Sequence, residues 1–168
     1  MKMKIILSLA VSLASLSAMA RTDVIPNAII DMHIVTCPDV STKPGEMFYE
    51  VHKLTNGNTL YVLGCETYAY NTMEKAYIVD TLESVSAVSV PEILLDGSIG
   101  STTDLMGASF DPATETLSTF SKGRGMGDCG SSAIYKYNST YDSFALVEAR
   151  IKDSCDGVDS DWPVVYKR

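Results

Sequence analysis

The chain has 168 residues, four cysteines and a net charge of −8 at neutral pH. This length fits a single domain with a sizeable core. The acidic balance argues against nucleic acid or anionic lipid as a partner, because both bind basic surfaces. It permits a basic protein partner, although acidic side chains also serve solubility.

Residues 1–20 are predicted to form a secretory signal peptide. Lys2 and Lys4 precede an apolar stretch from Ile5 to Ser17, and Ala18-Met19-Ala20 provides small residues at a cleavage site. No stretch reaches the ~20 apolar residues that a membrane helix needs. We therefore expect a periplasmic or secreted bacterial protein with no membrane span after signal removal. This removal takes away two lysines and leaves a net charge of −10.

The rest of the chain is predicted to be rich in β-strands. Residues 21–44 are taken as an N-terminal extension and residues 45–168 as one β-rich domain. Short runs of Val, Ile, Tyr, Phe and Thr recur there between turn residues, whereas helical periodicity is hard to find. The expected fold is a single, mostly antiparallel β domain, either a sandwich or a small barrel.

The clearest unit is a hairpin between Met47 and Glu66. Its Asn56-Gly57 pair is typical of a two-residue type I′ turn. That turn predicts a strand register with four pairs: Val51 opposite Val62, Lys53 opposite Leu60, Tyr49 opposite Gly64, and His52 opposite Tyr61. The last pair favours a packing role for His52 over a catalytic one.

Further strands are expected along the chain. Pro91 should end the expected strand 85–90, because proline cannot donate to a strand ladder. Pro112 suits a type I turn. Residues 96–101 are expected to form a loop. In residues 132–138, Ala133, Tyr135 and Tyr137 should share one face. The expected strands are 76–81, 85–90, the strand-turn-strand unit 110–117, 132–138, 144–152 and 162–166.

The four cysteines predict two disulfides. An even cysteine count in an exported chain is typical of disulfide bonding. Of the three possible pairings, we favour Cys37 with Cys65 and Cys129 with Cys155, because each closes a loop of fewer than thirty residues. Metal ligation is the alternative, but there is no C-x-x-C pair.

The glycine loop, residues 122–130 (Lys-Gly-Arg-Gly-Met-Gly-Asp-Cys-Gly), is the candidate binding site. Such a segment needs an anchor if it is ordered, and Cys129 can supply one. The loop is either a strained structural turn or a recognition element. It formally matches the dinucleotide fingerprint G-x-G-x-x-G, but a strand-like run follows where that motif requires a helix. The candidate binding residues are Lys122, Arg124, Met126 and Asp128.

No residue is assigned to catalysis, metal or a cofactor. The two histidines lie in the first third of the chain, and no G-x-S-x-G elbow occurs. Acidic residues crowd around Cys155, but they miss the D-x-D-x-D-G spacing of calcium loops and are expected to form a solvated acidic loop. They are Asp153, Asp156, Asp159 and Asp161. We therefore expect binding rather than catalysis, and the sequence leaves the oligomeric state open.

Several motifs, in order, resemble bacterial domain-of-unknown-function family 1176. They are Cys65 with Ala69-Tyr70-Asn71, residues 110–114, 117–120, 122–130 and 144–146, and Cys155-Asp156-Gly157 followed by Trp162-Pro163. The resemblance covers residues 45–168. It implies an exported protein without a settled biochemical role, corresponding to the C-terminal half of longer members. The family's tryptophan and glycine near Tyr137 and Tyr141 are absent here.

A second likeness concerns residues 131–135, Ser-Ser-Ala-Ile-Tyr. They are similar to the S-G-x-x-Y motif of periplasmic lysozyme inhibitors, although the glycine is missing. With the acidic charge, this suggests inhibition of a basic cell-wall hydrolase. The expected function is thus a non-enzymatic binding module. A hydrolase inhibitor is the first alternative and an envelope hydrolase the second.

Overall fold

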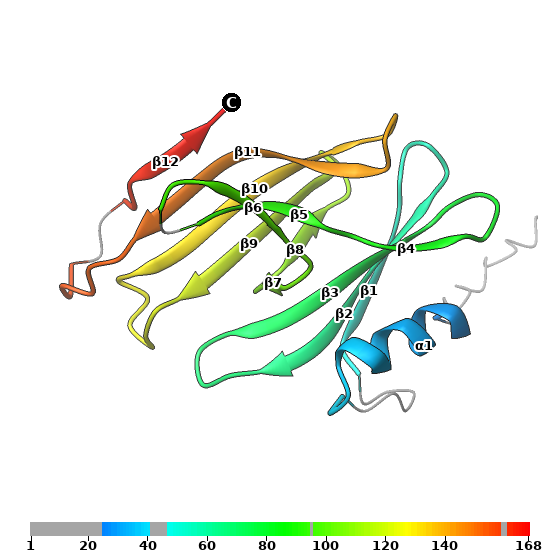
Figure 1. Ribbon diagram of the computed structural model, residues 1–168, viewed down its shortest axis with the longest axis horizontal. Coiled ribbons are helices and arrows are strands. Elements are labelled where there is room, and N and C mark those ends of the chain that lie inside the picture. The colour runs from blue at the N-terminus through cyan, green and yellow to red at the C-terminus, as the bar shows by residue number, and fades with distance from the viewer. Residues whose placement is uncertain (1–24, 41–46, 95, 159–160) are drawn as a thin grey trace, which may run out of the picture.

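The fold is an open antiparallel β sandwich (Figure 1). The computed structural model describes residues 25–40, 47–94, 96–158 and 161–168, so the predicted signal peptide lies outside the described residues. The mostly β, antiparallel prediction is confirmed. The sequence left a sandwich and a small barrel open, and the structure shows a sandwich, because the described strands form three sheets and no closed barrel.

The first sheet has the strand order β1-β2-β3-β4, with β7 also paired to β3. The second sheet has the order β12-β11-β10-β9-β8, and β5 and β6 form a separate two-stranded ribbon. The elements are α1 (Asn27–Thr36), β1 (Tyr49–Lys53), β2 (Thr59–Thr67), β3 (Thr72–Val79), β4 (Val85–Ala87), β5 (Val90–Ile93), β6 (Ile99–Thr102), β7 (Leu105–Met106), β8 (Ser109–Asp111), β9 (Thr116–Lys122), β10 (Gly130–Asn138), β11 (Ser143–Lys152) and β12 (Val164–Lys167).

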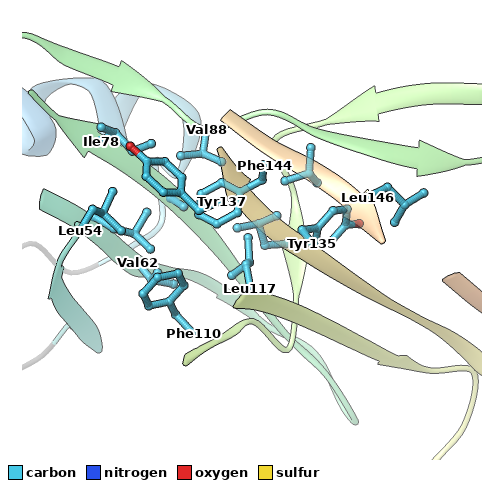
Figure 2. Packing of buried hydrophobic residues seen from close by; sticks show 14 of the residues in the cluster. Leu54, Val62, Ile78, Val88, Phe110, Leu117, Tyr135, Tyr137, Phe144 and Leu146 are labelled. Carbon is cyan, nitrogen blue, oxygen red and sulfur yellow. The ribbon is translucent and has the colours of Figure 1, made fainter. Parts of the chain in front are cut away.

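The main core fills the space between the two large sheets (Figure 2). Alternate residues of β2 and β3 point into it from one side, and those of β9, β10 and β11 from the other. Tyr135 and Tyr137 are buried there and Ala133 packs against them, so the predicted shared face of these three residues is confirmed. Other members include Leu60, Val62, Ile78, Phe110, Leu117, Phe144 and Leu146.

Helix α1 covers the other face of the first sheet. Its Ile29 is fully buried in a second cluster with Tyr61, Leu63 and Tyr77 of β2 and β3. The Cys37–Cys65 disulfide joins the end of the helix to β2, with Cα atoms 5.3 Å apart. The described part of the predicted N-terminal extension therefore packs on the sheet as a structural layer. The second predicted disulfide, Cys129–Cys155, is also present, with Cα atoms 4.9 Å apart.

The predicted register of the first hairpin is wrong by one residue. Val51 pairs with Tyr61 and His52 with Leu60. A type I′ turn needs positive φ at both central residues, but only Gly57 of the pair has it. The Leu54 amide instead donates to the Asn58 carbonyl, which closes a three-residue loop with glycine in the left-handed position. The shift turns the side chain of His52 to the inter-sheet side, where its ring contacts Phe110.

The predictions around Pro91 also need correction. The expected strand 85–90 is two strands, and β5 continues through Pro91, which lies opposite Ser101 in the ribbon. Proline is tolerated because β5 is paired on one side only. Part of the expected loop 96–101 is β6, which follows a tight turn at Gly97. The strand-turn-strand unit at 110–117 is confirmed as β8 and β9.

Candidate functional site

The glycine loop connects β9 to β10 as a hairpin. Lys122 pairs with Gly130 at its base, and the Gly123 amide donates to the Cys129 carbonyl at 2.8 Å. At the tip, the Gly127 amide donates to the Arg124 carbonyl at 3.0 Å, which closes a turn over residues 124–127. The strand that follows is the one expected from the sequence, so the loop does not open a helix.

Asp128 is buried and held by three donors. Arg124 donates from Nε to Oδ1 at 2.7 Å and from Nη2 to Oδ2 at 2.5 Å, and the Gly157 amide donates to Oδ2 at 2.6 Å. The Arg124 guanidinium, aided by that amide, holds the pKa of Asp128 well below its usual value, and the carboxylate raises the pKa of Arg124. Asp128 thus fixes the loop to the C-terminal segment, next to the Cys129–Cys155 disulfide.

A turn of the first sheet contacts the same loop. Asn71, between β2 and β3, accepts a hydrogen bond from the Lys122 amide at 2.8 Å and donates one to the Lys122 carbonyl at 2.9 Å. The neighbouring Tyr70 lies against Gly125, where an added Cβ would come within 2.8 Å of the tyrosine ring. Two motifs separated by about fifty residues therefore meet in one place.

Large apolar side chains are exposed around this contact. Met126 is 71% exposed and Tyr70 57%, and Tyr68 and Phe120 are also exposed. The last three line a groove of about 490 Å³ together with Lys122. The Phe120 ring also stacks on Trp162, with ring centroids 5.1 Å apart. We call Tyr68, Tyr70, Phe120 and Met126 the tip surface.

The four predicted binding residues have different environments. Met126 reaches solvent, Arg124 is partly exposed, Lys122 is half-buried and Asp128 is buried. The aromatic members of the tip surface were absent from the predicted site. Tyr70 and Phe120 do stand in the quoted motifs, but nothing in a single sequence shows that the turn at Tyr70 reaches the glycine loop.

Both histidines take part in packing. His33 is buried between Tyr77 and the Gly64 carbonyl, each 3.0 Å from a ring nitrogen. His52 lies 3.0 Å from Glu50. Within the part of the chain that the structure describes, no three His, Cys, Asp or Glu residues are grouped so that they could hold a metal ion.

In the C-terminal acidic segment, Asp156 pairs with a lysine, whereas Asp161 is exposed. Lys152 Nζ donates to Asp156 at 2.9 Å, and this bond, with one from the Val158 amide, lowers the pKa of Asp156. Lys152 Nζ also donates to the Val158 carbonyl at 2.7 Å. Asp153 is exposed, and Asp159 lies outside the described residues.

Among the described helices, none is long and apolar enough to cross a bilayer.

The structure thus defines a disulfide-bonded, antiparallel β-sandwich domain with an anchored glycine hairpin. The chain belongs to the family described as "Protein of unknown function (DUF1176)", whose model matches residues 8–168. The predicted family is confirmed, and the match begins well before residue 45, so that it includes α1.

One curated relative is the "Uncharacterized protein YpfG" of Escherichia coli (strain K12). It is 31% identical over 157 residues, covering 90% of this chain and 43% of that protein. The chain therefore spans less than half the length of this relative. No solved structure matches the chain.

Proposed function

We propose that the protein is an exported, non-enzymatic binding module and that the tip surface is its contact face. The observation that carries this proposal is the exposure of four large apolar side chains on one anchored framework. Exposed apolar patches on soluble domains are typical of interaction sites. Tyrosine in particular supplies a large contact area with few torsions to immobilise.

The anchoring lowers the entropic cost of binding. Asn71 ties the tyrosine turn to β9, while Asp128 and the Cys129–Cys155 disulfide tie the glycine loop to the C-terminal segment. A surface that is already ordered loses little conformational freedom on association. The same contacts give the loop an architectural role, so the recognition and structural interpretations are compatible.

The predicted compartment and the net charge indicate which class of protein the partner belongs to. Two disulfides are typical of an oxidising compartment, in agreement with the predicted signal peptide. The acidic charge, −8 for the whole chain and −10 after removal of the predicted signal peptide, favours a basic periplasmic or extracellular protein through electrostatic steering.

A pull-down from periplasmic extract tests the proposal. The exported protein serves as bait beside the double variant Tyr70→Ser/Met126→Ser. Tyr141→Ser is the control, because Tyr141 is 77% exposed in the turn at the other end of β10. We expect a partner that the wild type and the control retain and the double variant loses, with all three folded by circular dichroism. Equal retention by the double variant would contradict the assignment of the contact face.

Inhibition of a basic cell-wall hydrolase is the second candidate. It is favoured by the turn at residues 124–127, which exposes Met126 on an acidic protein. The protein should then reduce the activity of a lysozyme at micromolar excess, and Met126→Ser should weaken this effect. Full activity of several lysozymes in the presence of the protein would exclude this candidate.

The competing hypothesis of an envelope hydrolase makes a different prediction. It requires turnover of cell-wall glycans or peptides that is lost when Arg124 or Asp128 is replaced. We expect no turnover, because the Asp128 oxygens are already bound by Arg124 and the Gly157 amide.

A further inference from the structure

A second concave surface lies between the β5–β6 ribbon and the inner face of the second sheet. The ribbon packs over β11 (Figure 1). Three adjoining hollows of about 90, 380 and 270 Å³ lie between their side chains. Ile93 of the ribbon and Ile151 of β11 line all three. We call these three adjoining hollows together the ribbon groove. It lies on the opposite face of β9 from Phe120, because alternate strand residues point to opposite sides.

The ribbon groove has a mixed lining of apolar side chains, small hydroxyl groups and charged side chains. Ile99 is 63% exposed, and Leu94 and Val165 are also exposed along its outer part. Ser121 and Ser131 lie on the inner face nearer the glycine loop. They are beyond the main core, and Ser121 is half-buried while Ser131 is exposed. Such a lining can hold an extended chain by apolar contacts and by hydrogen bonds to its backbone.

The groove is lined by charged side chains of both signs, and the unpaired ones among its described residues are carboxylates. Glu92 and Asp153 line it and have no ion-pair partner among the residues that the structure describes. Two cations also line the groove, but both are already engaged: Lys152 with Asp156, and Arg150 with Glu148 and the Trp162 carbonyl. A cation entering the groove therefore meets carboxylates that are available to it.

We propose that the ribbon groove binds an extended cationic segment of a partner protein, in which Lys or Arg alternates with apolar residues. Alternation places cations on one side of an extended chain and apolar side chains on the other. The apolar side fits Ile93, Ile99 and Ile151, and the cationic side fits Glu92 and Asp153. The inference rests on the proposed function for the basic character of the partner, but it uses a different surface.

A labelled decapeptide of alternating lysine and valine is the probe, and its binding is followed by fluorescence anisotropy. We expect the double variant Glu92→Gln/Asp153→Asn to bind roughly 3- to 10-fold more weakly, as the loss of two exposed ion pairs implies. The matched control is Asp39→Asn/Glu83→Gln, which removes two exposed carboxylates elsewhere. It should bind as the wild type does, and Ile99→Ser should weaken binding at every salt concentration.

Equal binding by the Glu92/Asp153 variant and its control overturns the proposal, as does failure of the wild type to bind the peptide. The Tyr70→Ser/Met126→Ser variant separates this result from the proposed function. It should bind the peptide normally while losing the partner in the pull-down. If the peptide fails while that pull-down still depends on Tyr70 and Met126, the groove assignment alone is wrong.

Discussion

The side-chain amide of Asn71 pairs with the backbone of Lys122 as a neighbouring strand would. It accepts from the Lys122 amide and donates to the Lys122 carbonyl. This happens where β9 has extended past β8, whose pairing ends at Ser118. One side chain thereby completes the edge of the second sheet and connects it to the first at the start of the glycine loop.

Replacing Asn71 with alanine should destabilise the fold. The change leaves a backbone donor and acceptor of β9 without their partner, which costs about 1–3 kcal/mol. Urea unfolding with the disulfides intact measures the effect. The control is Asn138→Ala, because the Asn138 side chain accepts from Thr140 within its own turn. A loss no larger than that of the control would show that water replaces the Asn71 contacts freely.

Replacing Gly130 with alanine should be more damaging than replacing another glycine of positive φ. Gly130 has a φ of +140°, and an added Cβ would overlap the Ser121 carbonyl oxygen. Gly97 has a φ of +81°, and an added Cβ there would have no atom within 4 Å. Gly97→Ala should therefore lower the free energy of unfolding only by the cost of a left-handed backbone, roughly 1–2 kcal/mol. Thermal unfolding of both variants should place Gly130→Ala clearly lower. Equal melting temperatures would mean that the β9–β10 base widens without cost.

The strands were predictable because their residue types and alternation reflect which face is buried. This holds for β10, where Tyr135 and Tyr137 lie in the core as expected. The register of the first hairpin was not predictable from Asn56-Gly57. The Asn56 side chain donates to Asp142 in the β10–β11 turn, a contact 86 residues away that no local turn preference contains.

The site was predictable only in part, for the same reason. The glycine loop and its disulfide follow from local composition and cysteine spacing. The burial of Asp128 depends on Gly157, and the tip surface depends on the approach of Tyr70 from the other sheet. These are long-range contacts, so a single sequence gives the residues of the glycine loop without showing which of them reach solvent or which aromatic residues join them.

Removing the Cys129–Cys155 disulfide should lower stability and weaken partner capture together. The bridge closes a loop with a sequence separation of 26 residues. Its loss is expected to lower the free energy of unfolding by about 2–4 kcal/mol. The double serine variant, compared in urea unfolding and in the pull-down, checks both effects. Cys37→Ser/Cys65→Ser is the matched control, with a separation of 28, and should lose similar stability but retain the partner. Loss of capture in both variants would indicate a general effect of instability.

Asp128→Asn should make the stability of the protein less sensitive to acid. The native pKa of Asp128 lies below its ordinary value of 3.8, so the native state binds its proton less readily than the unfolded state. The stabilising effect is complete above that ordinary value and is lost as the pH falls further. Melting temperatures from pH 7 to 2 should converge for wild type and variant at the acid end. Asp39→Asn, an exposed control, should run parallel to wild type.

Protonation of His33 should loosen helix α1. In the neutral ring, Nε2 carries the proton and donates it to the Gly64 carbonyl. Nδ1 therefore accepts a hydrogen bond from the Tyr77 hydroxyl. Burial, with Lys75 adding to it, lowers the pKa of His33, so the unfolded state takes up the proton first. Stability is therefore lost as the pH falls below the ordinary value of 6.5, by at most about 1.4 kcal/mol per pH unit. Thermal unfolding between pH 7.5 and 4.5 should show this loss in wild type and in His52→Gln but not in His33→Gln. Parallel profiles for wild type and His33→Gln would mean that His33 keeps the same proton occupancy in both states.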